Sequence, residues 1–598
     1  MSQLTVGFAA SRPPRSGPLA FGHANIVRAI TLDDDPTRLT LAMVFDIPAG
    51  RDLRTVARHL ATLVERHESL RTAYELGAPP VQHVAAEGEF VLDVVESTGD
   101  GGDALELAEA TARRLRSGIF DLGKEAPFRV AAVTVDGEPR HLVWVVSHAA
   151  MDVAACELLR AEWSALAAGR ELPPAPELEP LDVVELEQSS SVRRLAESAV
   201  RYWESSLRRV PQANFAQPIA APAKTDWRHP GLTIRSHAAP EQLAAIAERT
   251  ETSPSAVALA ALATLVRHRT ALETIAVTSI AGNRVVRKLR GFFGSLAQDA
   301  LLPLEIGGPE GASGFDDVVR RTQAATLPAY RTSWFDPAAV WRGIDAVSTQ
   351  RGMSFARDLV FNDMSALAAV SGSAEESARG RLPGVWIPGH QEPLVEEPGL
   401  GGGISWKAAE DIPCRFFACL YRITGEFELT VWIDPQTLDR AEAEEFGRAY
   451  LRLLAAAAEA DVPLTEVAGL TDLVPVEYGQ GWVLADGCRV ELAAVRALMD
   501  EALDGAPCLV TAVADAELGQ RIVCHLAEAE AECTPTEAHR RALALLPGRV
   551  SALAPHNYVV HDAAPAQERI GDLAAWTAQL VRAESTGRLP RGDEDGAS

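Results

Sequence analysis

The chain has 598 residues, of which 47% are hydrophobic and 23% are charged, and its formal net charge is −26. This length is too great for one hydrophobic core and predicts about three to four domains. The acidic balance argues against nucleic acid and anionic membranes as main partners, because both are bound through clustered positive charge.

No run of residues approaches the ~18 consecutive apolar positions of a membrane helix, and the first residues lack the pattern of a secretory signal. The seven cysteines are scattered and never in C-x-x-C spacing, so we expect reduced thiols in a cytoplasmic protein, with no disulfide frame and no metal site. The acidic run Asp33-Asp-Asp35 is interpreted as a solvated turn, because nothing nearby offers converging ligands.

The first region of the chain runs to about residue 172. Apolar residues between 53 and 64 keep the spacing of one buried helix face. The run Leu142-Val-Trp-Val-Val146 predicts a strand buried on both faces, because it has no polar side. A helix is predicted from Asp152 to about residue 168, with Asp152 in the position of an N-cap.

A proline-rich linker at residues 171–180 leads into the second region, which opens with a long helical pattern to about residue 209. Helical and strand patterns then alternate, and strands are predicted at 274–280 and 427–433. This region ends near residue 460 with a helix rich in alanine and leucine.

The third region, residues 469–585, shows a smaller α/β pattern. The charged tail at 586–598 is expected to be disordered. The segment Gly399-Leu-Gly-Gly-Gly-Ile-Ser-Trp-Lys407 is glycine-rich but lacks the G-K-[ST] ending of a phosphate loop, and we interpret it as a flexible loop.

His148 is the candidate reactive residue, because it lies between the predicted buried strand and the predicted helix. Reacting groups commonly sit on loops that rigid elements hold. A neutral imidazole can accept a proton from an amine or hydroxyl near pH 7. Asp152, four residues later, can cap the helix and pair with a cation. Taken alone, H-x-x-x-D spacing is more often structural, so the spacing leaves both interpretations open.

Two stretches, Arg66-His-Glu-Ser-Leu-Arg-Thr-Ala-Tyr74 and Val145-Val-Ser-His-Ala-Ala-Met-Asp-Val153, resemble motifs of the condensation domains of non-ribosomal peptide synthetases, in the chloramphenicol acetyltransferase-like superfamily. The second stretch falls where that family has H-H-x-x-x-D-G. The family's other motifs are matched in order along roughly the first 460 residues, by Gly17-Pro-Leu-Ala-Phe-Gly22, Phe120-Asp-Leu122, Ala126-Pro-Phe-Arg129, Arg201-Tyr-Trp-Glu-Ser-Ser-Leu207, Ile280-Ala-Gly-Asn-Arg284 and Gly291-Phe-Phe-Gly294.

The resemblance implies an α/β (α+β) fold with two lobes in a V and an active site in a tunnel between them. Residues 1–175 would form the N-lobe and residues 176–465 the C-lobe. His148 corresponds to the catalytic histidine, which takes the proton from the attacking amine, or orients the amine and stabilises the tetrahedral intermediate. Asp152 corresponds to the structural aspartate of the motif, with Arg284 as its partner.

The resemblance also implies that carrier proteins deliver the acyl donor on a phosphopantetheine arm, while the acceptor enters from the opposite face. The chain itself is expected to bind no cofactor. Val153, Ser295 and Asn362 are candidates for the tunnel wall, and Ser147 is a candidate support of the active-site loop.

The sequence departs from the family pattern at four places. Ser147 replaces the first histidine of the motif, and Val153 replaces its closing glycine, where a β-branched residue would be strained or would narrow the tunnel. His23-Ala-Asn25 stands where a glutamine and aromatic residues are usual, and Gly294-Ser-Leu296 replaces Val-Asn-Thr.

Two functions therefore stay open. One is a stand-alone condensation enzyme that forms an amide, or less commonly an ester. The other is a degenerate condensation fold that recruits carrier proteins or tailoring enzymes. An epimerase of the same superfamily is a weaker third option.

Residues 469–585 resemble the small C-terminal subdomain of adenylation domains, through Gly487-Cys-Arg-Val-Glu-Leu492 and Tyr558-Val-Val-His-Asp-Ala-Ala-Pro565. The large adenylation subdomain and its phosphate loop are absent, and the sequence has no lysine after Lys407. Arg569 is nearest to the position of the family's catalytic lysine, but arginine is bulkier and forked. We therefore expect a degenerate subdomain that activates no amino acid and covers the second lobe or docks a partner.

Overall fold

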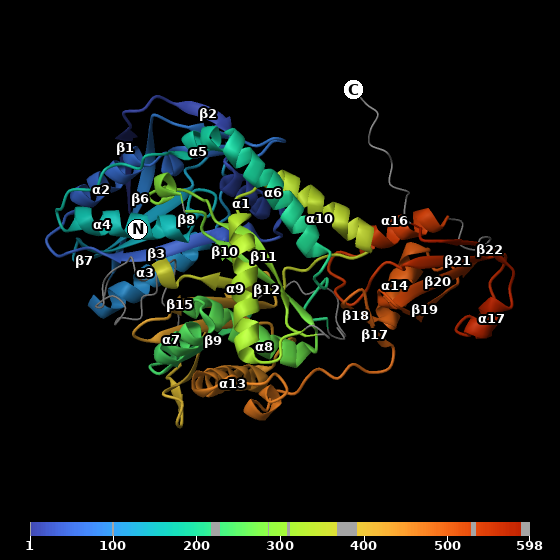
Figure 1. Cartoon of the computed structure of the whole chain (residues 1–598). Coiled ribbons are helices and arrows are strands. Elements are labelled where there is room, and N and C mark those ends of the chain that lie inside the picture. The colour runs from blue at the N-terminus through green and yellow to red at the C-terminus, as the bar shows by residue number, and fades with distance from the viewer. Residues whose placement is uncertain are drawn as a thin grey trace.

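The computed structural model describes residues 2–97, 101–216, 228–284, 286–307, 311–367, 392–527 and 534–587. These residues form two lobes, each built around its own sheet, and a third α/β region that lies beside the C-lobe (Figure 1). Apart from two residues at its start, the predicted tail lies outside the described residues. No helix in the described ranges is both long and apolar enough to cross a bilayer.

The N-lobe sheet has the order β1-β6-β7-β8-β3, in which only β6 and β7 are parallel neighbours. Its strands are β1 (Ser2–Ala9), β3 (Thr40–Asp46), β6 (Glu87–Ser97), β7 (Phe128–Val135) and β8 (Glu138–Ser147). A small sheet of β2 (Arg15–Pro18), β4 (Thr72–Glu75) and β5 (Val81–Val84) lies apart from it, and helix α1 (Phe21–Leu32) follows β2.

Strand β8 is buried on both faces, as its apolar run predicts. Trp144 and its alternate neighbours pack with α2 (Leu53–Arg66) and α4 (Val153–Ala167) on one face of the sheet. Val143 and Val145 pack with α3 (Gly101–Arg116) on the other face. The strand that ends at the active-site turn is thus held from both sides, so the turn starts from a rigid base.

The C-lobe sheet has the order β11-β10-β12-β15-β16-β9-β14-β13. Its strands are β9 (Arg228–Ser236), β10 (Thr274–Ala281), β11 (Gln298–Glu305), β12 (Leu359–Asp363), β13 (Val395–Glu397), β14 (Gly402–Asp411), β15 (Phe416–Arg422) and β16 (Phe427–Ile433). Helices from this lobe cover one face of the sheet, namely α7 (Ala239–Thr250), α8 (Pro254–Thr270), α9 (Phe315–Arg331) and α13 (Arg440–Glu459).

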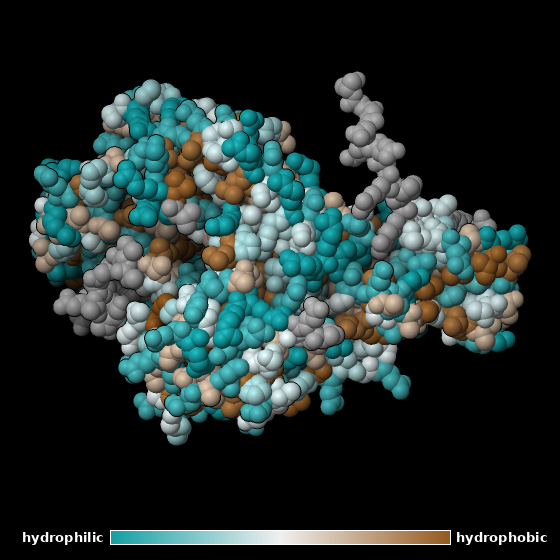
Figure 2. All heavy atoms as spheres, in the orientation of Figure 1, coloured by the Kyte–Doolittle hydropathy of each residue, from teal (hydrophilic) through white to brown (hydrophobic). Residues whose placement is uncertain are grey.

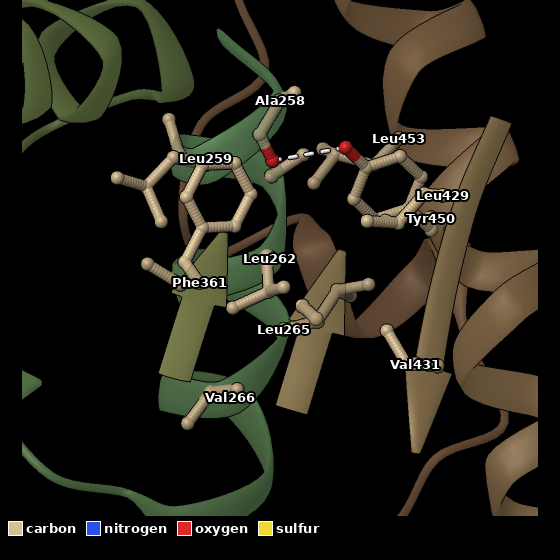
Figure 3. Close-up of a cluster of buried hydrophobic side chains, with 14 of the residues drawn as sticks. Ala258, Leu259, Leu262, Leu265, Val266, Phe361, Leu429, Val431, Tyr450 and Leu453 are labelled. Atoms are coloured by element: carbon tan, nitrogen blue, oxygen red, sulfur yellow. Dashed lines mark hydrogen bonds between the residues drawn. The ribbon is translucent and has the colours of Figure 1, made fainter. Parts of the chain in front are cut away.

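The centre of the C-lobe core lies between α8, α13 and the sheet (Figure 3). Helix α8 is buried nearly all round, so its apolar residues show little preference for one side. The hydroxyl of buried Tyr450 on α13 donates a hydrogen bond of 2.9 Å to the carbonyl oxygen of Ala258 on α8. This bond satisfies a polar group that burial would otherwise leave unpaired.

The long helical pattern predicted before residue 209 is two helices rather than one. Helix α5 (Pro180–Glu187) has Gln188 as its C-cap. Helix α6 (Ser190–Leu207) then begins with Ser189 as its N-cap, and the hydroxyl of Ser189 accepts a hydrogen bond from the Val192 amide. The capping serine marks the break. Helix α10 (Pro337–Arg351) packs along α6, and both run toward the third region (Figure 1).

The described residues of the third region form a six-stranded sheet and three α-helices. Its strands follow the order β18-β17-β20-β21-β22, and β19 also pairs with β20. The elements are β17 (Trp482–Ala485), β18 (Cys488–Glu491), α14 (Leu492–Ala502), β19 (Cys508–Asp515), β20 (Gly519–Ala527), α16 (Pro535–Leu545), β21 (Asn557–His561), α17 (Leu573–Thr577) and β22 (Val581–Ser585). The α/β pattern expected from the sequence is therefore present.

The third region is joined to the C-lobe by a shared core and an arginine clasp. Met353, just after α10, is 1% exposed and belongs to the apolar core of the third region. Arg351 donates to the carbonyl oxygens of Leu207 and Val210 in the C-lobe, at 2.5 and 2.7 Å. It also donates to the carboxylate and to the carbonyl oxygen of Asp486, both at 2.8 Å. The region covers the end of the C-lobe, one of the two arrangements that the sequence suggested.

Candidate active site

His148 stands on the turn that joins β8 to α4. Its amide donates to the carbonyl oxygen of Leu39 at 2.9 Å, which ties the turn to the segment before β3. The side chain is half-buried, and its Nδ1 atom is buried without a geometric hydrogen-bond partner among the described residues. Because Nδ1 is buried, Nε2 is the candidate ring nitrogen for contact with a substrate.

The surroundings of His148 favour its neutral form. Burial lowers the pKa of His148 below its usual value, although the charge of Asp152 and its own backbone carbonyl act in the opposite direction. A neutral imidazole has a free lone pair at pH 7, so the residue is prepared to accept a proton rather than to donate one.

Asp152 is 2% exposed and accepts hydrogen bonds from both lobes. It caps α4 through the Ala155 amide at 3.0 Å, as the sequence predicts. Both its oxygens bind the guanidinium of Arg284, at 2.7 and 2.8 Å. The amides of Leu296 and Ala297 donate to it at 2.9 and 3.2 Å. Burial alone would raise the pKa of Asp152, but Arg284 and these amides lower it below its usual value.

Arg284 reaches this site from the C-lobe, 132 residues beyond Asp152. The same two terminal nitrogens also donate to the carbonyl oxygens of Gly282, Phe292 and Gly294, at 3.1, 3.3 and 2.9 Å. The structure thus joins the two residues that the resemblance pairs. A bidentate arginine that also holds three carbonyls fixes the lobe-to-lobe geometry directly behind the His148 turn.

The Gly291-Phe-Phe-Gly294 motif belongs to a C-lobe segment that enters the N-lobe. Phe293 is fully buried in the N-lobe core and stacks on His67 with ring centroids 3.7 Å apart. The hydroxyl of Ser69 donates to the carbonyl oxygen of Phe293 at 2.8 Å. These contacts explain one aromatic residue of the motif, because the Phe293 ring anchors the segment. Gly294 allows close approach, since an added Cβ would lie 2.6 Å from the ring of Phe292.

Ser147 and Ser295 both lie beside the His148 turn. Ser147, the last residue of β8, is 3% exposed, and its hydroxyl oxygen accepts from the Ala149 amide at 3.3 Å. Ser295 is 1% exposed, and its hydroxyl donates to the carbonyl oxygen of His148. The two serines therefore shape the backbone on either side of the histidine.

The predicted strain at Val153 is absent, which corrects the expectation that this position needs glycine. Val153 is the first residue of α4 and does not have a positive φ angle. Its half-buried side chain packs against a C-lobe cluster of Met364, Cys419, Tyr421 and Trp432. Helical backbone accepts a β-branched residue at little cost, so the effect of Val153 is on the space between the lobes.

Asn362 lies on β12, half-buried, opposite Cys419 of β15 in the register of the sheet. Its side chain interacts with the thiol of Cys419, which belongs to the cluster that Val153 contacts. Asn362 is thus near the same lobe boundary as Val153. Apolar side chains are visible between the two lobes on one face of the molecule, where most of the surface is hydrophilic or intermediate (Figure 2).

The acidic run Asp33-Asp-Asp35 is a solvated turn only in part, since the side chain of Asp34 is 68% exposed but that of Asp33 is 11% exposed. Asp33 and Asp34 both pair with Arg38, and Arg38 also binds Asp411 of the C-lobe at 2.7 Å. The side chain of Arg38 is only 6% exposed. The run is therefore part of an ion cluster that links the lobes, which a local pattern could not reveal because Asp411 is distant in sequence.

The glycine-rich segment after residue 399 is a turn followed by a strand rather than a loop near the site. Residues 402–411 form β14, and Gly402 pairs with Ser236 at the end of the strand away from Asp411. A ten-residue strand spans about 30 Å, so the glycines lie far from the lobe boundary. Glycine is needed at 402 and 403 because an added Cβ would lie within 2.3 Å of a neighbouring backbone oxygen.

Within the described ranges, no group of three or more His, Cys, Asp or Glu residues is placed to hold a metal ion. The six described cysteines are buried free thiols.

His23 is a neighbour of the site that was not selected from the sequence. It lies in the first turn of α1, is completely buried, and accepts from the Ser295 amide at 3.4 Å. Its ring also meets Phe292 edge-on, with centroids 6.1 Å apart. The departure of the opening motif at this position was the available signal, but nothing in the sequence connects residue 23 with residue 295.

The chain resembles known proteins chiefly over its two lobes. It is 24% identical to Bacitracin synthase 2 of Bacillus licheniformis over 391 residues, which are 64% of this chain and 14% of that protein. The condensation domain of Monacolin K polyketide synthase MokA has a TM-score of 0.56 at 16% identity, over 76% of this chain and 100% of the other. The X-domain from teicoplanin biosynthesis has a TM-score of 0.55 at 19% identity, over 76% and 97%.

At these identities, the structural likenesses establish the fold alone. The family described as "Condensation domain" matches residues 29–373, which is more than half of the chain and includes the His148 turn, Asp152 and Arg284. This protein therefore belongs to the condensation domain family of non-ribosomal peptide synthesis, whose members generally form amide bonds from carrier-bound substrates.

Proposed function

We propose that this condensation unit transfers an aminoacyl, peptidyl or other acyl group from a carrier-protein thioester to an amine, and less commonly to a hydroxyl. The observation that supports this most directly is a half-buried histidine with a lowered pKa on a turn that both lobes hold. Such an imidazole has the position and protonation state of a general base.

The reaction balances without any group beyond the two substrates. The amine nitrogen attacks the thioester carbonyl, and a C–N bond forms as the C–S bond breaks. His148 takes the proton that the amine loses, and the departing thiolate of the carrier arm receives a proton. His148 acts as the base in this scheme, and Asp152 with Arg284 are positioning residues that hold its turn.

In this proposal the two lobes form a V that encloses a substrate tunnel at His148. Val153 would lie on its N-lobe side and Asn362 on its C-lobe side, and Ser295 would support the backbone of His148 itself. Acyl donors reach the tunnel on the phosphopantetheine arm of a separate carrier protein. In this proposal the chain itself binds no cofactor. The acceptor is free or carrier-bound.

The third region is proposed to be a degenerate adenylation-type subdomain without activating chemistry. Arg569, at the nearest position to the lysine of that family, pairs with Asp572 at 2.6 Å, and its side chain is 60% exposed. The attachment of the third region to the C-lobe through Met353 and Arg351 supports a structural role for this region.

The test is mass spectrometry of an acyl-loaded carrier protein mixed with candidate amines and this chain. His148→Ala should abolish the amide product, with a loss of about 10²-fold or more, because general-base catalysis contributes about 10²–10⁴-fold. His141→Ala is the matched control, because His141 lies on the same strand but pairs with Asp46 outside the site. Undiminished product from the His148 variant would overturn the assigned role.

A second candidate is a non-catalytic condensation fold that recruits carriers or tailoring enzymes. Ser147 in place of the first motif histidine favours it, and so does the likeness to the teicoplanin X-domain, which has been solved in complex with OxyB. Binding of a carrier or tailoring enzyme by both wild type and His148→Ala, with no product from either, would support this candidate.

A further inference from the structure

The start of α1 lies unusually close to the C-lobe segment at residues 294–297. A Cβ atom added to Gly22 would stand 2.4 Å from the carbonyl oxygen of Ser295 and 2.6 Å from the Cα of Leu296. Glycine at position 22 is therefore what allows the helix to approach. The approach brings the next residue, His23, against Ser295.

One residue, Ser295, connects His23 with the backbone of His148. The amide of Ser295 donates to Nε2 of His23 at 3.4 Å, and the hydroxyl of Ser295 donates to the carbonyl oxygen of His148. All three residues come from different parts of the chain, so this path joins α1, the inserted C-lobe segment and the active-site turn.

His23 can accept the amide hydrogen only while Nε2 carries no proton. Burial lowers the pKa of His23 to about 4. The charge of Asp152 acts against this shift, and the charge of Arg284 adds to it. The proton of the neutral ring is then on Nδ1, which is buried without a hydrogen-bond partner among the described residues. A buried nitrogen without a hydrogen-bond partner lowers the stability of the folded state. We take this cost as an indication that the hydrogen bond at the other nitrogen, Nε2, contributes to the site.

We propose that His23 is a positioning residue of the His148 site and acts through Ser295. This inference rests on the proposed function, since it gives His148 a working role. His23 and Ser295 are also two of the positions at which this sequence departs from the motifs of its family, and they contact each other. The alternative explanation is that His23 has only a packing role and fills volume beneath α1.

The two explanations differ in which substitutions are tolerated. Glutamine can accept the Ser295 amide hydrogen through its side-chain oxygen, whereas leucine fills a comparable volume and accepts nothing. If His23 positions the turn, His23→Gln keeps the connection and His23→Leu breaks it. Ser295→Ala breaks the second half of the path, because it removes the hydroxyl that holds the His148 carbonyl.

The experiment measures His148 itself in the full chain, without any substrate. Histidine-labelled protein gives the pKa of His148 by NMR, and its signal is assigned by its loss in His148→Gln. Mass spectrometry gives the rate at which diethylpyrocarbonate modifies His148. We expect His23→Leu and Ser295→Ala to raise the pKa toward its ordinary value and to speed modification, because a loosened turn exposes the ring. His23→Gln should resemble wild type.

His229→Leu is the matched control, because it removes another fully buried histidine, whose ring contacts the Cys414 carbonyl in the C-lobe sheet. It should lower stability without changing His148. Equal behaviour of His23→Leu and His23→Gln, or an unchanged His148 in His23→Leu, would overturn the proposal and leave only a packing role. Neither readout needs turnover, so a chain that makes no amide but shows the expected pattern refutes the proposed function and not this connection.

Discussion

The C-lobe makes two interfaces that share an apolar anchor and differ in their ion pairs. Toward the N-lobe, Phe293 enters the apolar core, and two ion pairs cross the boundary, namely Arg284 with Asp152 and Arg38 with Asp411. Toward the third region, Met353 enters the partner's apolar core. Arg351 supplies the adjoining clasp.

The difference shows what each interface is suited to do. Buried ion pairs demand one geometry, because a displaced partner leaves a charge unpaired, and this suits the boundary that holds the His148 turn. A shared apolar core has no such direction but is hard to separate. The third region is attached to the C-lobe through both an apolar contact and an arginine clasp.

The largest effect is expected from Arg284→Ala. It leaves Asp152, which is 2% exposed, without its cation and should destabilise the protein by about 3–5 kcal/mol. The fall in melting temperature and the urea midpoint measure it. Arg209→Ala, which removes an exposed pair with Glu305 at 3.1 Å, is the control and should cost about 0–1 kcal/mol. Similar losses in both variants would remove the distinction between this interface and the ordinary surface.

A somewhat smaller effect is expected from Arg351→Met at the other interface. This variant removes the donor to the carbonyl oxygens of Leu207 and Val210 and to the carboxylate of Asp486. The free energy of unfolding should fall by about 2–4 kcal/mol. Limited proteolysis should then release the third region by cleavage between residues 460 and 481. The exposed Arg540→Met is the control, because it lies in the third region but only pairs with Glu537 on the same helix. Release of the third region from wild type at the same rate would contradict the shared-core description.

The smallest effect concerns pH at the lobe boundary. Glu187 is 4% exposed and accepts from the Phe21 amide and from the Trp334 indole at 2.9 Å. Burial raises its pKa to about 8, against an ordinary value of 4.5, and these hydrogen bonds only partly oppose the shift.

The folded state therefore keeps a proton that the unfolded chain releases above the ordinary pKa. The contribution of Glu187 to stability is complete below that value and is lost as pH rises through about 8. Glu187→Gln is neutral throughout, so its stability advantage over wild type should grow as pH rises, by up to about 1.4 kcal/mol for each pH unit between the two pKa values. Thermal melts from about pH 5 to about pH 9 measure it, with the exposed Glu305→Gln as control. A difference that does not change with pH would mean that the carboxyl is charged in both states.

Much of the local structure of the active site could be predicted from the sequence. The apolar run before Ser147 specified a doubly buried strand, and Asp152 specified the start of α4, because burial and capping are encoded by neighbouring residues. The ordered motifs also indicated Arg284 as the partner of Asp152. Two local interpretations were wrong, namely strain at Val153 and a loop that continues through residues 402–407, and the run at residues 33–35 is solvated only in part.

The sequence by itself determined the local frame of His148, since the strand, the turn and the cap around it are set by neighbouring residues. Only the tertiary structure decided what holds that turn in place. Asp411 binds Arg38, Ser295 lies between His23 and His148, and Met353 leaves its own lobe for another core. Such pairings depend on how whole lobes pack, and packing brings together residues whose separation along the chain carries no local signal.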